Sequence, residues 1–176
     1  MANREALREL QSRLATRLKA AKAEGVSVAW LAVKAGGHHY LLPLSQSGEI
    51  FSMTNLQPVP HVREWFRGVL NIRGGLYGVV DLAAFVADSG GIPRTGPPVA
   101  EASVVTLNPL LEVNCALQVD NLAGLRGAEA FKSSALPDAA SPVFFGNRFV
   151  DTEGVQWQEI NLRSLSQFPP FLSISA

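Results

Sequence analysis

The sequence is short of the features that mark secreted, membrane-spanning and polyanion-binding proteins. Its 176 residues include a single cysteine, Cys115, so no disulfide can form within the chain, as is usual in a reducing cytosol. Fifteen Lys and Arg residues balance fifteen Asp and Glu residues, so no overall field attracts nucleic acid or anionic lipid. Charges recur from Arg4 to Lys22 and interrupt any apolar run typical of a signal peptide or transmembrane helix. We therefore expect a cytoplasmic protein without membrane insertion.

Motifs for catalysis and cofactor binding are also missing. No G-x-S-x-G sequence occurs, and Gly74, Gly75 and Gly78 are not followed by the Lys-Ser or Lys-Thr of a phosphate-binding loop. The adjacent His38 and His39 point to opposite faces of a strand, which is poor geometry for one metal ion, so we expect exposed hairpin residues. We predict no metal, no cofactor and no enzyme activity. A hydrolase with a dispersed Ser/His/Asp site remains an alternative.

An amphipathic helix is predicted over residues 3–24. The segment carries six basic and three acidic residues, but its apolar stripe has no aromatic residue to enter a membrane surface. We expect the helix to pack on the body of the domain or on a partner, and Gly25 to end it. Apolar residues at steps of three and four form its stripe: Leu7, Leu10, Leu14, Leu18 and Ala21.

The remaining sequence predicts a mostly β protein in two similar halves. Gly and Pro residues dominate 88–99, which we interpret as a crossover between a lobe at about 26–87 and a lobe at about 100–166. Together they form a domain over 26–170, followed by a tail at 167–176. Short helices are expected at 82–86 and from Leu162 to the Pro169-Pro170 pair. Short apolar runs between turns predict strands near 26–33, 39–44, 49–53, 66–72, 76–81, 102–107, 112–119, 143–149 and 155–161.

Two small β lobes are also compatible with OB-like barrels that bind single-stranded nucleic acid through exposed aromatic residues. The region after residue 24 is net acidic, however, with twelve acidic and nine basic residues. Phenylalanine in such a region is more often part of the core. This alternative depends on four residues: Phe131, Phe144, Phe145 and Phe149.

The segment 65–82 predicts a hairpin with polar residues that core packing does not explain. Its apolar residues build two strands around Gly74-Gly75, which leaves Asn71, Arg73 and Asp81 without a core role. Arg73 precedes the turn, where its planar guanidinium can present several donors at the rim of a groove. A purely structural ion pair of Arg73 with Asp81 or Glu49 is an equally open interpretation.

The same region resembles the CheW-like family of chemotaxis coupling proteins. The resemblance covers about residues 28–166 and is strongest in the first half. There it is carried by Tyr40, Glu49-Ile50, Val59-Pro60, Trp65, Gly68-Val69, Asn71-Ile72-Arg73-Gly74 and Val79-Val80-Asp81-Leu82. Looser second-half matches are Val104-Val105, Ala116–Asp120, Leu122 and Trp157–Leu165.

The resemblance implies a fold of two five-stranded, β-barrel-like lobes around a shared core, with no catalytic activity. It further implies a scaffold that joins the cytoplasmic tip of a methyl-accepting chemoreceptor to the regulatory domain of a CheA-type histidine kinase. The N-terminal helix, Trp30 and Trp65 resemble the branch associated with type IV pili and twitching motility. Two positions depart from the family, because it usually has proline at Gly78 and an apolar residue at Ser47. The matching receptor-contact positions are Ser47, Glu49, Gly68, Asn71, Arg73 and Gly74.

Overall fold

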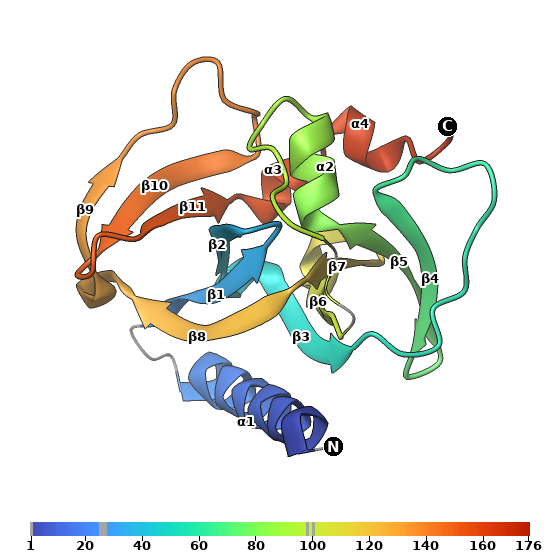
Figure 1. Ribbon diagram of the computed structural model, residues 1–176, viewed down its shortest axis with the longest axis horizontal. Coiled ribbons are helices and arrows are strands. Elements are labelled where there is room, and N and C mark those ends of the chain that lie inside the picture. The colour runs from blue at the N-terminus through green and yellow to red at the C-terminus, as the bar shows by residue number, and fades with distance from the viewer. Residues whose placement is uncertain (1, 25–27, 98, 100) are drawn as a thin grey trace.

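The computed structural model describes residues 2–24, 28–97, 99 and 101–176, and shows two β-sheets with short helices between them and helix α1 on the outside (Figure 1). The first sheet has six strands in the order β8-β1-β2-β11-β10-β9. Its strands are β1 (Val28–Ala35), β2 (His38–Pro43), β8 (Asn121–Gly127), β9 (Phe131–Ala135), β10 (Phe145–Asp151) and β11 (Gln156–Ile160).

The second sheet has five strands in the order β3-β6-β7-β5-β4. No pairing joins the outer strands of either sheet in the described part of the chain, so neither sheet closes into a barrel. Its strands are β3 (Ser47–Ser52), β4 (Phe66–Ile72), β5 (Gly75–Asp81), β6 (Ser103–Leu107) and β7 (Cys115–Val119). The mostly β prediction is therefore confirmed, with six and five strands in place of five and five.

The two sheets do not correspond to the two halves of the sequence. β1 and β2 pair with strands that follow the crossover, and β3, β4 and β5 share a sheet with β6 and β7. Two parallel pairings, of β2 with β11 and of β5 with β7, join the halves. The division into lobes at 26–87 and 100–166 is therefore corrected, because long-range strand pairing and not chain order decides membership of a sheet.

Both sheets contribute to one apolar core. Its buried residues include Tyr40 of β2 and Leu117 of β7, and Phe85 of helix α2 (Leu82–Asp88) packs among them. The shared core expected from the sequence is thus present.

In the described part of the chain, 3₁₀ turns lie at Leu44–Gln46 (η1), Pro109–Leu111 (η2) and Ala128–Ala130 (η3).

Local signals located several elements correctly and missed others. β4 and the start of α2 lie where the sequence predicts them, while β7 begins at Cys115 because Glu112 adopts a left-handed backbone with φ of 58°. β8 and β9 were not predicted. β8 contains two glycines and β9 reads Phe-Lys-Ser-Ser-Ala, and neither has the apolar alternation of an isolated strand signal.

Helix α1 (Ala2–Glu24) confirms the predicted N-terminal helix and packs on the body of the domain. Leu14 and Leu18 are buried, whereas Leu10 is 46% exposed. Gly25, the predicted helix stop, lies outside the described residues. None of the described helices is both long and apolar enough to cross a membrane.

The segment 167–176, expected to be a tail, packs against the domain. After α3 (Leu162–Ser166), the Pro169-Pro170 pair ends one helix and begins another, α4 (Pro169–Leu172). Phe171 is buried beside Phe85, with ring centroids 5.2 Å apart. The expected tail thus contains an apolar residue, Phe171, that packs against the domain.

Candidate functional site

The tip of the β4–β5 hairpin is the most polar part of the predicted site. Ile72 and Gly75 are paired, and the two residues between them have positive φ angles, 51° at Arg73 and 81° at Gly74. This is the backbone of a tight two-residue hairpin turn. Asn71 stabilises it, because its Oδ1 accepts a hydrogen bond from the backbone N–H of Gly74 at 3.0 Å. The turn projects the Arg73 side chain outward, where it is 63% exposed.

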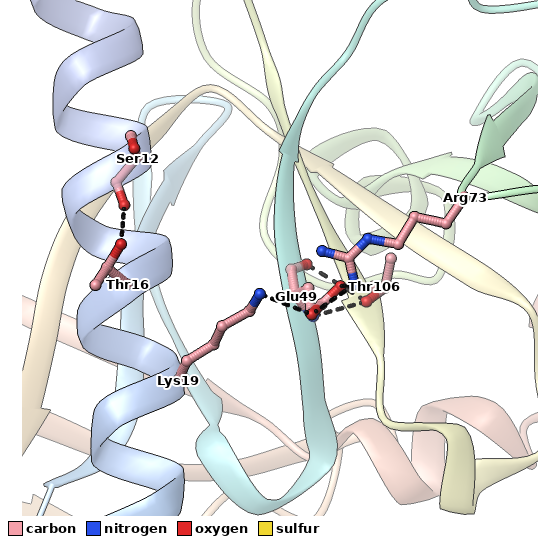
Figure 2. A network of polar contacts seen from close by, with 6 residues as sticks. All are labelled: Ser12, Thr16, Lys19, Glu49, Arg73 and Thr106. Atoms are coloured by element: carbon pink, nitrogen blue, oxygen red, sulfur yellow. Dashed lines mark hydrogen bonds and ion pairs between the residues drawn. The ribbon is translucent and has the colours of Figure 1, made fainter.

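Glu49 of β3 receives the guanidinium of Arg73. Arg73 Nη1 lies 2.8 Å from Glu49 Oε2 and 3.0 Å from Oε1. Figure 2 shows that Lys19 of α1 approaches the same carboxylate from the other side, with Nζ 3.5 Å from Oε1. One half-buried carboxylate therefore accepts two cations from separate elements, and the site carries a net positive charge.

The backbone of Glu49 is held as firmly as its side chain. Its N–H donates to Thr106 Oγ1 at 2.8 Å, and the Thr106 hydroxyl donates to its carbonyl at 3.4 Å (Figure 2). Between Ser47 and Ile50 the register of β3 with β6 shifts, so these side-chain bonds replace part of the regular ladder. The carboxylate is consequently presented from a fixed position.

A cavity of about 280 Å³ lies between the outer strands of the five-stranded sheet, next to Arg73. The guanidinium of Arg73 stacks over the ring of Phe51, 5.5 Å from its centroid. A hollow of mixed polar and apolar lining, with a charged, planar group at its rim, is suited to a side chain from another protein. Its lining residues are Phe51, Ser52, Thr54, Leu70, Asn71, Ile72 and Arg73.

Residues 29–139 match the family model described as the CheW-like domain. The chain belongs to the CheW-like domain family. A similar protein is PilI of Pseudomonas aeruginosa, which is 25% identical over 166 residues, covering 93% of this chain and 89% of the relative. The crystal structure of the scaffolding protein TtCheW from Thermoanaerobacter tengcongensis matches with a TM-score of 0.58 at 15% identity, covering 76% of this chain and 88% of the other. At that identity the structural match shows the CheW fold.

Four of the six site residues predicted from the CheW resemblance lie together. Glu49, Asn71, Arg73 and Gly74 surround the hairpin tip, all of them exposed or half-buried. The structural alternative for Arg73 is present, with Glu49 as its partner, because Asp81 pairs with Arg94 instead, at 2.7 Å. The receptor contact of Arg73 stays a prediction.

The other two predicted residues of the CheW site are interior and act on the backbone. Ser47 is fully buried, and its hydroxyl donates to the carbonyl of Pro43 at 2.8 Å. Gly68 has a φ of 136°, and a Cβ there would lie 2.2 Å from the carbonyl oxygen of Gln57. Ser47 and Gly68 therefore shape the site from behind and present no surface to a partner.

Gly78, the departure from the CheW pattern, has a structural reason. Its N–H donates to the carbonyl of Asn114 at 3.0 Å, a bond that proline cannot make. A Cβ at this position would lie 2.9 Å from Phe66 Cε2, so the Phe66 ring occupies the space of a larger residue. Gly78 thus takes part in the pairing of β5 with β7.

Sequence reasoning missed Lys19 as a member of the site. The basic residues of 1–24 were visible, but nothing in the sequence indicates which of them meets Glu49. Lys19 reaches it because Leu18 is buried under the helix and the adjacent residue then lies at the edge of the contact.

A cavity of about 490 Å³ lies apart from this site over the six-stranded sheet. His38 and His39 line it and are half-buried, which corrects their expected exposure. His38 Nε2 lies 2.8 Å from the carbonyl oxygen of Pro93, and no hydrogen bond joins Ser141 to either imidazole within the described residues. The Ser/His pairing of a hydrolase is not formed here. The remaining lining residues are Ile92, Ser141, Phe145, Arg148, Gln156 and Gln158.

The four phenylalanines of the nucleic-acid alternative do not form an open stacking surface. Phe144 is fully buried and packs on Phe85 at 5.6 Å between centroids. Phe131 and Phe149 are half-buried and pack on each other and on Trp30. Bases need exposed ring faces, so these rings serve packing.

Proposed function

We propose that this CheW-like protein is a cytoplasmic adaptor that couples the tip of a methyl-accepting chemoreceptor to the regulatory domain of a CheA-type histidine kinase. Membership of the family and the fold shared with a scaffolding protein support a role in assembly rather than catalysis. The similarity to PilI supports a chemosensory system that controls type IV pili and twitching motility. No cofactor and no nucleic acid enter this proposal.

The observation that carries the proposal is the exposed Arg73 guanidinium at the hairpin tip, held by Glu49 beside a cavity that Phe51, Leu70 and Ile72 line together with polar residues. A receptor tip is helical and offers apolar side chains with polar groups around them. Apolar residues can fill the cavity between β3 and β4, while Arg73 donates several hydrogen bonds at its rim. Asn71 and Gly74 keep the turn in the conformation that presents Arg73.

Arg73→Ala tests the receptor contact. We expect at least a tenfold loss of affinity for a fragment of the cognate receptor tip, because interface arginines are often among the few residues that dominate binding. The fold should persist, since an exposed ion pair contributes about 0–1 kcal/mol. Arg67→Ala is the matched control, because Arg67 is exposed on the same strand β4 and should leave binding unchanged. Unaltered affinity of the Arg73 variant would remove this residue from the site.

The kinase contact is tested by co-purification of the full chain, the CheA-type kinase and the receptor fragment. A ternary complex that needs this chain to form is the expected result. The two partners assembling equally well without it would exclude the coupling role. Deletion of the gene in its host should abolish twitching on an agar surface, and intact twitching would direct the output elsewhere.

A further inference from the structure

Helix α1 rests on the domain through a narrow contact. It lies beside β3 and β8, outside both sheets (Figure 1). Leu14 and Leu18 are its buried leucines, while Leu10 remains 46% exposed. A contact formed by two leucines on adjacent turns is that of a helix laid into a shallow groove, as in complexes between amphipathic helices and their receptors.

The polar contacts of α1 include a part-buried hydrogen bond and an exposed ion pair. Gln11 bridges two strands, because its Nε2 donates to Ser103 Oγ at 2.6 Å and its Oε1 accepts from Ser52 Oγ at 2.6 Å. Arg4 pairs with Glu101 at 2.6 Å, with side-chain exposures of 75% and 39%. Water and salt screen the Arg4–Glu101 ion pair, so it orients the helix more than it retains it.

Space remains along the seam between α1 and the domain. A cavity of about 70 Å³ lies between Leu18 and Lys19 on one side and Ile50 and Arg73 on the other. A second one of about 30 Å³ lies near Leu7 and Leu10. Both crevices are open to solvent and lie along the edges of the contact between α1 and the domain.

We propose that the surface under α1 is a docking site for an amphipathic helix of the chemoreceptor. Helix α1 of the same chain competes with the receptor helix for this site. The α1 seat, as we name it, consists of Leu44, Glu49, Ile50, Ser52 and Ser103. The positive charge of Lys19 complements the negative charge of Glu49. Leu14 and Leu18, four positions apart, pack with the apolar residues of the seat, Leu44 and Ile50. The partner helix therefore carries two large apolar residues four positions apart, followed by a basic residue.

This inference rests on the proposed function only for the identity of the partner. Glu49 links this docking site to the adaptor role, because its carboxylate pairs with both Lys19 of α1 and Arg73 of the hairpin tip. A helix that replaces α1 takes over the Lys19 position and at the same time reaches Arg73 and the cavity beside it. The partner helix can then bind only when α1 leaves the seat. Competition by α1 therefore lowers the apparent affinity of the chain for the partner helix.

The direct test supplies α1 in trans. In the full chain, Leu14→Asp with Leu18→Asp detaches the helix, and the probe is a fluorescent peptide of residues 3–24. We expect the peptide to bind this variant at least tenfold more tightly than the wild-type chain, whose seat is filled. A peptide carrying Lys19→Glu is the matched control and should bind at least threefold more weakly. Equal binding of the peptide to both chains, or no binding, would overturn the inference.

Folding of the detached variant is checked by circular dichroism and by thermal unfolding. If the double variant does not fold, Leu18→Ala in the full chain replaces it, with the same peptide and the same criterion. Amide shifts of Ile50 and Ser103 locate the peptide on the seat. Shifts confined to other strands would count against the proposal.

A receptor fragment separates this inference from the adaptor proposal. The detached variant should bind it at least tenfold more tightly than the wild-type chain. If the peptide occupies the seat and neither chain binds the receptor, the seat accepts helices and the receptor-coupling role is wrong. If both chains bind the receptor equally and the peptide does not bind, the adaptor role holds and the competition by α1 is wrong.

Discussion

Arg94 Nη1 lies 2.7 Å from Asp81 Oδ2 and ties the crossover segment to the end of β5. Both side chains are largely buried, at 18% and 9% exposure. The other oxygen of Asp81 accepts a hydrogen bond from the N–H of Ala84 at 3.1 Å and caps α2. Arg94 also lies 3.7 Å from Asp120, which follows β7 and binds the N–H of Gly36. Arg94 therefore connects the crossover with the ends of β5 and β7, and Asp120 extends this network to the turn between β1 and β2.

Arg94→Met should destabilise the protein by about 3 kcal/mol, because it leaves the buried Asp81 carboxylate without its guanidinium. Urea denaturation followed by circular dichroism measures the change. The double variant Arg94→Met with Asp81→Asn removes the unpaired charge and keeps an amide able to cap α2. It should recover part of the loss, and strictly additive losses would refute the coupling.

Gly68→Ala should cost about 3 kcal/mol of unfolding free energy. A Cβ at this position meets the backbone of Gln57, and the φ of 136° is strained for any residue with a side chain. Gly74→Ala is the matched control, since its φ is also positive but nothing lies within 4 Å of the added Cβ. Its cost should be about 1 kcal/mol. Equal costs would show that contact with Gln57 is relieved by movement of the loop.

Stability should fall with pH below neutrality because of His39. Burial, together with the nearby Lys34 charge, lowers the pKa of His39 below its ordinary value of 6.5. The unfolded chain then binds a proton that the folded one does not, so stability present above pH 6.5 is lost as the pH falls through the folded-state pKa. An NMR titration should place the imidazole midpoint below 6.5. His39→Gln should flatten the pH dependence in this window, and an unchanged slope would assign it to other groups.

Cys115 should resist thiol reagents in the folded protein. It is buried in β7, and burial raises the pKa of its thiol to about 12. The thiolate is therefore scarce at pH 8 and out of reach of a reagent. Labelling should be complete only in denaturant. Ser133→Cys in the exposed strand β9 supplies a reactive thiol for comparison and should label at once.

Exchange of the charges at the hairpin tip tests whether Arg73 and Glu49 act as a pair. Arg73→Glu or Glu49→Arg alone places like charges together and should reduce receptor binding. The double exchange restores the attraction but reverses the group offered to the partner. It should recover only part of the thermal stability, because an arginine at position 49 faces Lys19, and it should not recover binding. Full recovery of binding would indicate a role confined to structure.

The hairpin and its surroundings were predictable because their signals are local. Gly74 permits the turn, apolar residues define β4 and β5, and Asp81 begins α2 as a side-chain cap. For Arg73 the sequence indicates either a role in partner binding or an ion pair with Asp81 or Glu49. The family resemblance then selected the same segment.

Other features depend on contacts between distant segments. β9 is a strand because β10 pairs with it, and its polar sequence gives no sign of this. Ser47 and Gly68 belong to the family pattern, yet only their burial distinguishes supports of the site from its surface.

Short-range spacing and motifs predict the mostly β class, the N-terminal helix, the hairpin turn and the resemblance to the family, because each of these signals lies within one segment of the chain. The tertiary structure alone decided which strands share a sheet, that α1 covers β3, and that Lys19 and Arg73 meet at Glu49. These relationships join residues far apart in the chain. They are set by which apolar faces bury one another, and that is decided only when the whole chain packs.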